Sequence, residues 1–182
     1  MDMESAPVTG RSALERFARD LAMCLSVHRD RGPALVWPDG LEALVTESSV
    51  ARMEQATAWT GPGSPSVMPS GPARAEELAG EVGRLLGCEV RSSLLLLPAG
   101  EERSDNEAAT DRVLLPVRGA CDCRVELDPR GADRAPCGQA PALNLRLRVG
   151  EALYVPGGLT YALGGVHAPC ILHVISLHAA SW

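Results

Sequence analysis

The chain has 182 residues and no lysine, so it is long enough for one domain with a buried core and lacks the side-chain amine on which a protein Schiff base forms. Its net charge of -6 and the scattering of its seventeen basic residues, all arginine, argue against a nucleic-acid partner, because such binding needs clustered cations. The acidic residues 1–11 do not resemble a signal peptide, and no apolar run is long enough to span a membrane, so we expect a cytoplasmic protein without a membrane partner.

The first part of the chain is expected to be mainly helical. Ser12 and Glu15 form a capping-box pattern, and the apolar residues after them recur at helical spacing, which predicts a helix over residues 13–29. The apolar run at 33–37 predicts a short buried strand. A second helix is expected over residues 41–55.

A segment rich in proline and glycine follows this helical part. Residues 60–72 are expected to form a loop without regular structure. Proline at the start and glycine at the end of an amphipathic stretch predict a helix over 73–86. Because nothing before the loop could fold on a core of its own, we expect one domain over 1–182, with 1–72 as a helical lead-in and loop and 73–182 as the helix and the strands after it.

The remainder of the chain has the texture of a β-structure. Short apolar or alternating runs between turns predict strands at 90–97, 112–117, 121–127, 143–149, 152–155 and 170–177. In the 121–127 strand, alternation places Cys121 and Cys123 on the same face as Val125, which predicts that both cysteines point inward. Many short strands at this spacing are typical of a β-sandwich or barrel.

The six cysteines allow two interpretations. In a chain of this length they are too spread to form a disulfide framework, and the simpler interpretation is that they are small buried thiols. The alternative is a zinc site assembled from thiolates and imidazole, which are the ligands that zinc prefers. Its candidate ligands are Cys121, Cys123, Cys137, His167 and Cys170.

The order of these elements resembles a known family. The sequence "LLPAG" at 96–100, the glycine at 119, the segment "GEALYVPGGLTYAL" at 150–163 and the closing "ILH" at 171–173 resemble the JmjC-like cupins. These are Fe(II)- and 2-oxoglutarate-dependent oxygenases that include the ribosomal-protein hydroxylases. The resemblance implies a mainly β fold, a double-stranded β-helix (cupin or jelly-roll barrel) with helices on its N-terminal side.

The resemblance also shows where the metal ligands of that family would fall. The two ligands of its His-x-Asp motif fall on Asn106 and Ala108, and the last histidine falls on Tyr161. The basic residue that grips 2-oxoglutarate falls on Cys121, whereas a later aspartate is retained as Asp111. Since alanine cannot ligate and asparagine and tyrosine are poor substitutes for imidazole, we expect a degenerate site without Fe(II) or 2-oxoglutarate.

A slip of one residue would restore part of a metal site. Asp105 and Glu107 lie two residues apart and therefore on one face of a strand, and His173 or His167 would supply the imidazole from the opposite side. This arrangement predicts a metal-dependent oxygenase with relocated ligands. The alternative for the acidic residues is a solvated turn.

A site for chemistry without metal is also conceivable. If Tyr161, His173 and Asp111 share the barrel cavity with Cys121 and Cys123, His173 would act as the base and Tyr161 as the acid or hydrogen-bond donor. One of the cysteines would then be the nucleophile. The alternatives are that Tyr161 fills the volume of a lost metal and that His173 is a core histidine with a backbone partner.

Three functions follow from these patterns. The first is a metal-independent enzyme, such as a tailoring isomerase, cyclase or lyase of specialised metabolism, or a protein that binds a small molecule or short peptide in the barrel. The second is a non-catalytic partner that regulates an active enzyme, and the third is the relocated metalloenzyme. An open cavity with converging polar groups favours the first, whereas a filled barrel and an exposed apolar patch favour the second. A homodimer is the default expectation for a cupin barrel.

Overall fold

The computed structural model describes residues 7–29, 31–39, 67–68, 73–127 and 141–178. Helix α1 (Pro7–His28) begins earlier than the predicted residue 13, because Pro7 occupies the first turn, where a proline costs no hydrogen bond. Ser12 therefore lies inside the helix and is not its N-cap. Helix α3 (Ala73–Leu86) has its predicted bounds, and the helix expected over 41–55 lies outside the described residues. No helix of the described ranges is long and apolar enough to cross a membrane.

The predicted strands are present with small changes at their ends. Three further strands were not among them: the polar strand β4, the two-residue β2 within the segment expected to form a loop, and β9, which begins inside the segment 150–163 that carries the family resemblance. The strands are β1 (Ala34–Val36), β2 (Val67–Met68), β3 (Glu89–Leu97), β4 (Arg103–Glu107), β5 (Asp111–Arg118), β6 (Ala120–Glu126), β7 (Ala142–Arg148), β8 (Ala152–Val155), β9 (Thr160–Gly164) and β10 (Cys170–His178).

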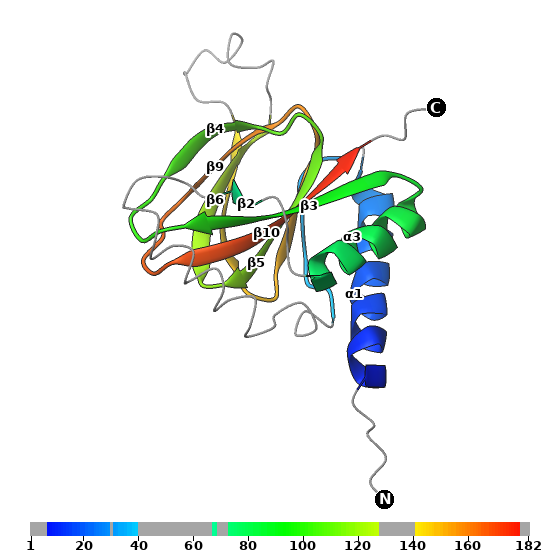
Figure 1. The fold of residues 1–182 in the computed structure, drawn as a ribbon. Helices are drawn as coiled ribbons and strands as arrows, with labels where there is room; N and C mark the ends of the chain where they lie inside the picture. The colour runs from blue at the N-terminus through cyan, green and yellow to red at the C-terminus, as the bar shows by residue number, and fades with distance from the viewer. Residues whose placement is uncertain (1–6, 30, 40–66, 69–72, 128–140, 179–182) are drawn as a thin grey trace, which may run out of the picture.

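The strands form two antiparallel sheets that face each other (Figure 1). One sheet has the order β1-β8-β5-β10-β3-β2, and the other has the order β4-β9-β6-β7. Leaving out the short edge strands β1 and β2, eight strands remain in two sheets of four, with neighbours that are distant in sequence. This is the arrangement of a jelly-roll barrel built from two Greek keys.

Two layers of apolar side chains hold the molecule together. The space between the sheets is filled by inward side chains of both sheets, and we call this layer the inner core. It comprises Leu95, Leu97, Ala108, Leu114, Cys121, Cys123, Val125, Leu147, Leu153, Val155, Tyr161, Leu163, Val166, Cys170, Leu172 and Val174. The second layer joins α1 and α3 to the outer face of the six-stranded sheet, through residues that include Phe17, Leu78, Leu115 and Ile175.

The tight connection between β5 and β6 shows why the barrel needs glycine at one position. Gly119 has a φ of +74°, in the left-handed region that side chains other than glycine rarely adopt. A Cβ atom at this residue would also lie 2.7 Å from the carbonyl oxygen of Pro169. Gly119 therefore allows β6 to turn back directly beside the start of β10.

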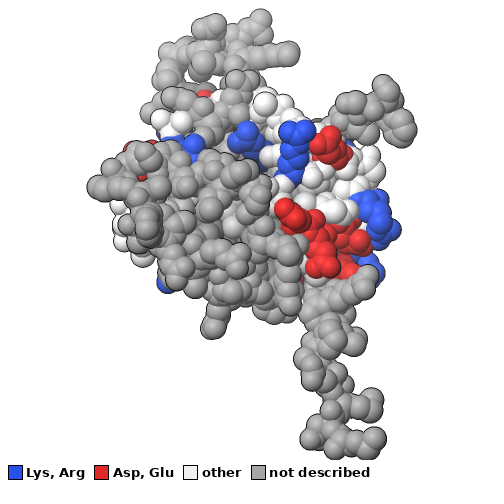
Figure 2. Space-filling model, viewed as in Figure 1, with Lys and Arg blue, Asp and Glu red and all other residues white. Residues whose placement is uncertain are grey.

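Charges of both signs lie together on the helical side of the molecule. Figure 2 shows acidic and arginine side chains next to each other over the helices, and Arg84 and Glu81 of α3 form an ion pair of 2.6 Å. Such alternation of sign does not produce the concentrated positive potential that binds nucleic acid. The expected absence of a nucleic-acid partner stays a prediction.

Candidate functional site

The positions at which the resemblance places metal ligands do come together. Asn106 of β4 lies directly opposite Tyr161 of β9 in the sheet. Ala108 follows β4, and its amide donates to the carbonyl of Leu159 at 3.0 Å, while its own carbonyl accepts from Gly158 at 2.7 Å. The backbone positions expected to carry metal ligands therefore lie close together, but their side chains are an amide, a methyl group and a phenol. This donor set does not fit the two imidazoles and one carboxylate of a non-haem iron centre.

Tyr161 is held in the inner core by an arginine that the sequence analysis missed. Its side chain is 3% exposed, and its hydroxyl oxygen accepts a hydrogen bond of 2.7 Å from Nη1 of Arg112 on β5. The guanidinium carbon lies 5.8 Å from the centre of the tyrosine ring. A fixed positive charge beside this ring opposes the binding of a metal cation there. The inward direction of Arg112 could have been predicted from alternation along β5, since Arg112 shares a face with the buried Leu114.

Cys121 and Cys123 point inward as predicted, and both are buried. The thiol of Cys121 is hydrogen-bonded to Cys170, and this contact and burial raise its pKa, whereas the same contact lowers the pKa of Cys170. Burial raises the pKa of Cys123 to about 12. Because the thiolate is the nucleophile, protonated thiols in an apolar core are poorly suited to covalent catalysis.

Of the two interpretations of His173, the one in which it points into the barrel cavity is wrong. In β10 its neighbours across the sheet are Leu94 and Leu115, which belong to the outer face, whereas Leu172 and Val174 belong to the inner core. The ring is 1% exposed, and its Nε2 atom lies 2.5 Å from the hydroxyl oxygen of Ser92. Burial lowers the pKa of His173 to about 4, so the ring is neutral at pH 7.

Asp111 is also turned away from Tyr161. It shares the outer face with Val113 and Leu115, by alternation along β5. Its Oδ2 atom accepts a hydrogen bond of 3.1 Å from Nε of Arg29, and its Oδ1 atom accepts one of 2.9 Å from the amide of Gly157. The carboxylate therefore ties the end of α1 to the turn before β9. The structure does not bring the five residues of the predicted metal-free site together.

Neither of the alternative metal sites is assembled by the described residues. Asp105 and Glu107 belong to β4 in the four-stranded sheet, whereas His173 lies on the outer face of the other sheet. Of the candidate zinc ligands, Cys137 is outside the described residues and His167 is exposed. No group of three histidine, cysteine, aspartate or glutamate side chains able to hold a metal occurs in the described ranges.

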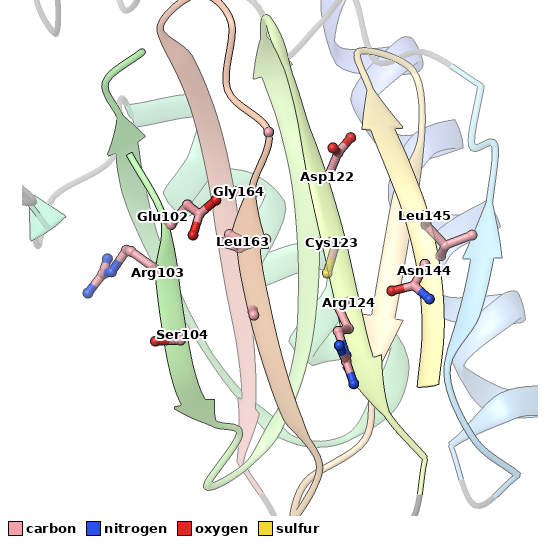
Figure 3. Close-up of a pocket in the computed structure, with 12 residues that line it drawn as sticks. Glu102, Arg103, Ser104, Asp122, Cys123, Arg124, Asn144, Leu145, Leu163 and Gly164 are labelled. Atoms are coloured by element: carbon pink, nitrogen blue, oxygen red, sulfur yellow. The ribbon is translucent and has the colours of Figure 1, made fainter. Parts of the chain in front are cut away.

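A cavity lies instead on the outer face of the four-stranded sheet, and we call it the outer groove (Figure 3). Its volume is about 600 Å³. The outward residues of β9, Ala162 and Gly164, form its floor, and longer polar side chains of the neighbouring strands form its walls. It is lined by Glu102, Arg103, Ser104, Asp122, Cys123, Arg124, Asn144, Leu145, Ala162, Leu163, Gly164 and Gly165.

The charges in the outer groove are partly compensated. Nη1 of Arg146 lies 2.7 Å from Oδ1 of Asp122, and it also donates to the carbonyl of Gly165 at 3.4 Å. Glu102 and Arg124 are exposed and have no ion-pair partner in the described part of the chain. The alternation that turns Cys121 and Cys123 inward implies an outward Arg124, but it does not predict the groove, which forms only when four strands are placed side by side.

Solved structures with the same fold were found by comparison. A prolyl-4-hydroxylase from Pseudomonas putida matches with a TM-score of 0.55 and 13% identity, over 92% of this chain and 100% of that chain. A cupin-superfamily protein from Desulfitobacterium hafniense DCB-2 matches with a TM-score of 0.42 and 15% identity, over 65% of this chain and 82% of that chain. No family model and no curated protein sequence matches. The topology and the first of these likenesses identify the fold as the cupin double-stranded β-helix, as predicted.

Proposed function

We propose that the protein is a ligand-binding protein that uses the cupin fold without Fe(II) or 2-oxoglutarate and takes its ligand in the outer groove. The contrast between the two sides of β9 carries this proposal. Its inward residues, Tyr161 and Leu163, belong to the inner core, whereas its outward residues, Ala162 and Gly164, floor a groove of about 600 Å³. That volume is within the usual range for ligand pockets.

The side chains at the former ligand positions support the part of the proposal that concerns iron. Asn106, Ala108 and Tyr161 offer no imidazole and no carboxylate, and Arg112 adds a positive charge. The small molecule or short peptide expected in the barrel is retained as the ligand, but its place moves to the outer face. A tailoring enzyme of specialised metabolism is less well supported, because His173 and Tyr161 lie on opposite sides of the six-stranded sheet.

The test is a titration of the isotope-labelled full chain followed by amide chemical shifts. Mixtures of polar metabolites and short peptides are added, and we expect at least one compound to shift the amides of Asp122, Ala162 and Gly164. The proposal fails if no compound shifts these amides, or if the shifts centre on inner-core residues such as Leu147 and Leu153.

A second candidate function is the non-catalytic partner protein. The filled inner core favours it, and so do apolar side chains on the surface of α1. Met23 is 65% exposed and Val27 is 48% exposed, and their spacing of four residues puts them on one helix face. If this face is an interface between two copies, sedimentation velocity will show a dimer that Met23→Arg converts to a monomer. A monomer for both chains would show that this face does not join two copies.

A further inference from the structure

We propose that the outer groove binds a zwitterion of the size of a dipeptide, with the ligand's ammonium group at Glu102 and its carboxylate at Arg124. The inference rests on the proposed function, because it names the ligand class of the same groove.

The strand register arranges the outward side chains in two rows. In the first row, Gly164 of β9 lies opposite Asp122 of β6. Glu102 lies on the other side of Gly164, since a Cβ atom built on Gly164 would be 3.3 Å from Cγ of Glu102. In the second row, Ala162 lies opposite Arg124, which in turn lies opposite Asn144 of β7.

The outward residues of β9 are small, whereas the strands on both sides of it carry longer polar side chains, so β9 lies at the bottom of a depression. A trough therefore runs along β9 between Glu102 and Ser104 on one side and Asp122 and Arg124 on the other (Figure 3). Larger residues are opposed here: a Cβ atom at Gly164 would lie 3.3 Å from Cγ of Glu102, and one at the next residue, Gly165, which has a φ of +60°, would clash with the carboxylate of Asp122.

The uncompensated charges of the trough have opposite signs in the two rows. Asp122 is neutralised by Arg146, so the first row retains the negative charge of Glu102. The second row retains the positive charge of Arg124, which no acidic side chain of the described ranges pairs. Arg103, at the rim, already has an interaction of its own. A ligand with an ammonium group at one end and a carboxylate at the other matches this polarity.

The spacing of the rows selects the length of the ligand. The rows are two residues apart along the strands, which corresponds to about 6.7 Å. An extended dipeptide spans about 7 Å, whereas a free amino acid spans roughly half of that and a tripeptide about 10 Å. Glu102 and Arg124 stand on opposite sides of β9, each roughly one strand spacing of about 4.8 Å from it, so a dipeptide that lies along β9 has one charged end within reach of each long side chain.

The first experiment measures affinity for diglycine by calorimetry on the full chain. Glycine, triglycine, N-acetyl-diglycine and diglycine amide serve as comparison ligands. We expect diglycine to bind most tightly, and each cap to weaken binding about fivefold or more by removing one charge. Equal affinity for the capped and free dipeptides would overturn the inference.

The second experiment pairs each protein charge with one end of the ligand. Glu102→Gln should weaken diglycine binding about fivefold and leave N-acetyl-diglycine unaffected, since that ligand has no ammonium group. Arg124→Gln should do the reverse, weakening the N-acetyl ligand and sparing diglycine amide. Glu89→Gln and Arg91→Gln, exposed on β3 away from the groove, are the matched controls and should change nothing.

The outcomes separate this inference from the proposed function. If diglycine fails to bind but another compound shifts the amides of Ala162 and Gly164, the zwitterion assignment is wrong and the ligand-binding function stands. If diglycine binds but Glu102→Gln and Arg124→Gln bind it as the parent does, the assignment is also wrong. Because both residues are exposed, amide spectra of the variants are expected to match the parent and to show that they are folded.

Discussion

The two faces of the four-stranded sheet differ although they are made from the same strands. On the inner face, Tyr161, Leu163 and Cys123 are almost fully buried in the inner core. On the outer face, the intervening residues Ala162 and Gly164 leave a trough with charged walls. Tyr161, at a position where the resemblance places a metal ligand, belongs to the inner face. Here the inner face is filled by packed side chains, whereas the outer face has a groove lined by polar and charged side chains.

The inner face should lose far more stability than the outer face when a side chain is shortened. Leu163→Ala removes a 2% exposed side chain and should lower the free energy of unfolding by about 2–5 kcal/mol, because a cavity is left behind. Urea denaturation measures the change. The matched control is Arg148→Ala, at an exposed position on the outer face of β7, with an expected change within about 0.5 kcal/mol. Equal losses at the two positions would contradict the contrast between the faces.

His173 is buried on the outer face of the six-stranded sheet. This burial should be visible in the pH dependence of the free energy of unfolding. The pKa of His173 is lowered by burial from 6.5 to about 4. Above pH 6.5 the ring is neutral in both states, whereas between pH 6.5 and about 4 only the unfolded chain takes up the proton. The free energy of unfolding should therefore fall by roughly 3 kcal/mol over this range.

Unfolding measured from pH 7.5 to 4 in the parent and in His173→Gln isolates this contribution. The difference between the two curves should follow the titration of His173. A difference that does not vary with pH would mean that the ring is protonated as easily in the native protein as in the unfolded chain.

The smallest expected effect concerns the polar pair within the inner core. Tyr161→Phe keeps the ring but removes the hydroxyl oxygen that accepts from Arg112, whose Nε atom is already buried without a partner among the described residues. The free energy of unfolding should fall by about 1 kcal/mol. Thermal unfolding detects a change of this size, and a variant as stable as the parent would show that the hydrogen bond contributes nothing.

Alternation predicted side-chain direction where only one face of a strand is apolar. In β6 the charged residues Asp122 and Arg124 mark the outer face, so the inward direction of Cys121 and Cys123 was predicted correctly. In β10 both faces are buried, because the strand lies between β5 and β3 with the inner core on one side and apolar clusters on the other. Period-2 reasoning cannot choose a face there, so both directions of His173 stayed open, and the inward one is wrong.

The resemblance predicted the fold and which positions lie together where metal ligands were expected, but it gave no information on the outer groove. The groove depends on residues that are far apart in sequence, such as Glu102 before β4 and Asn144 in β7. Their proximity follows from strand order and register, which local patterns do not encode. Strand β4 was missed for a related reason: its residues are polar and it lies at the edge of its sheet.

The central claim is that the ligand site lies on the outer face and not inside the barrel. The most direct test compares diglycine affinity in two variants, Ala162→Leu, which fills the floor of the outer groove, and Arg112→Leu, which removes the charged side chain of the inner core. We predict that Ala162→Leu abolishes binding and that Arg112→Leu, where it remains folded, binds as the parent does. Binding that survives Ala162→Leu but is lost in a folded Arg112→Leu protein would contradict the claim.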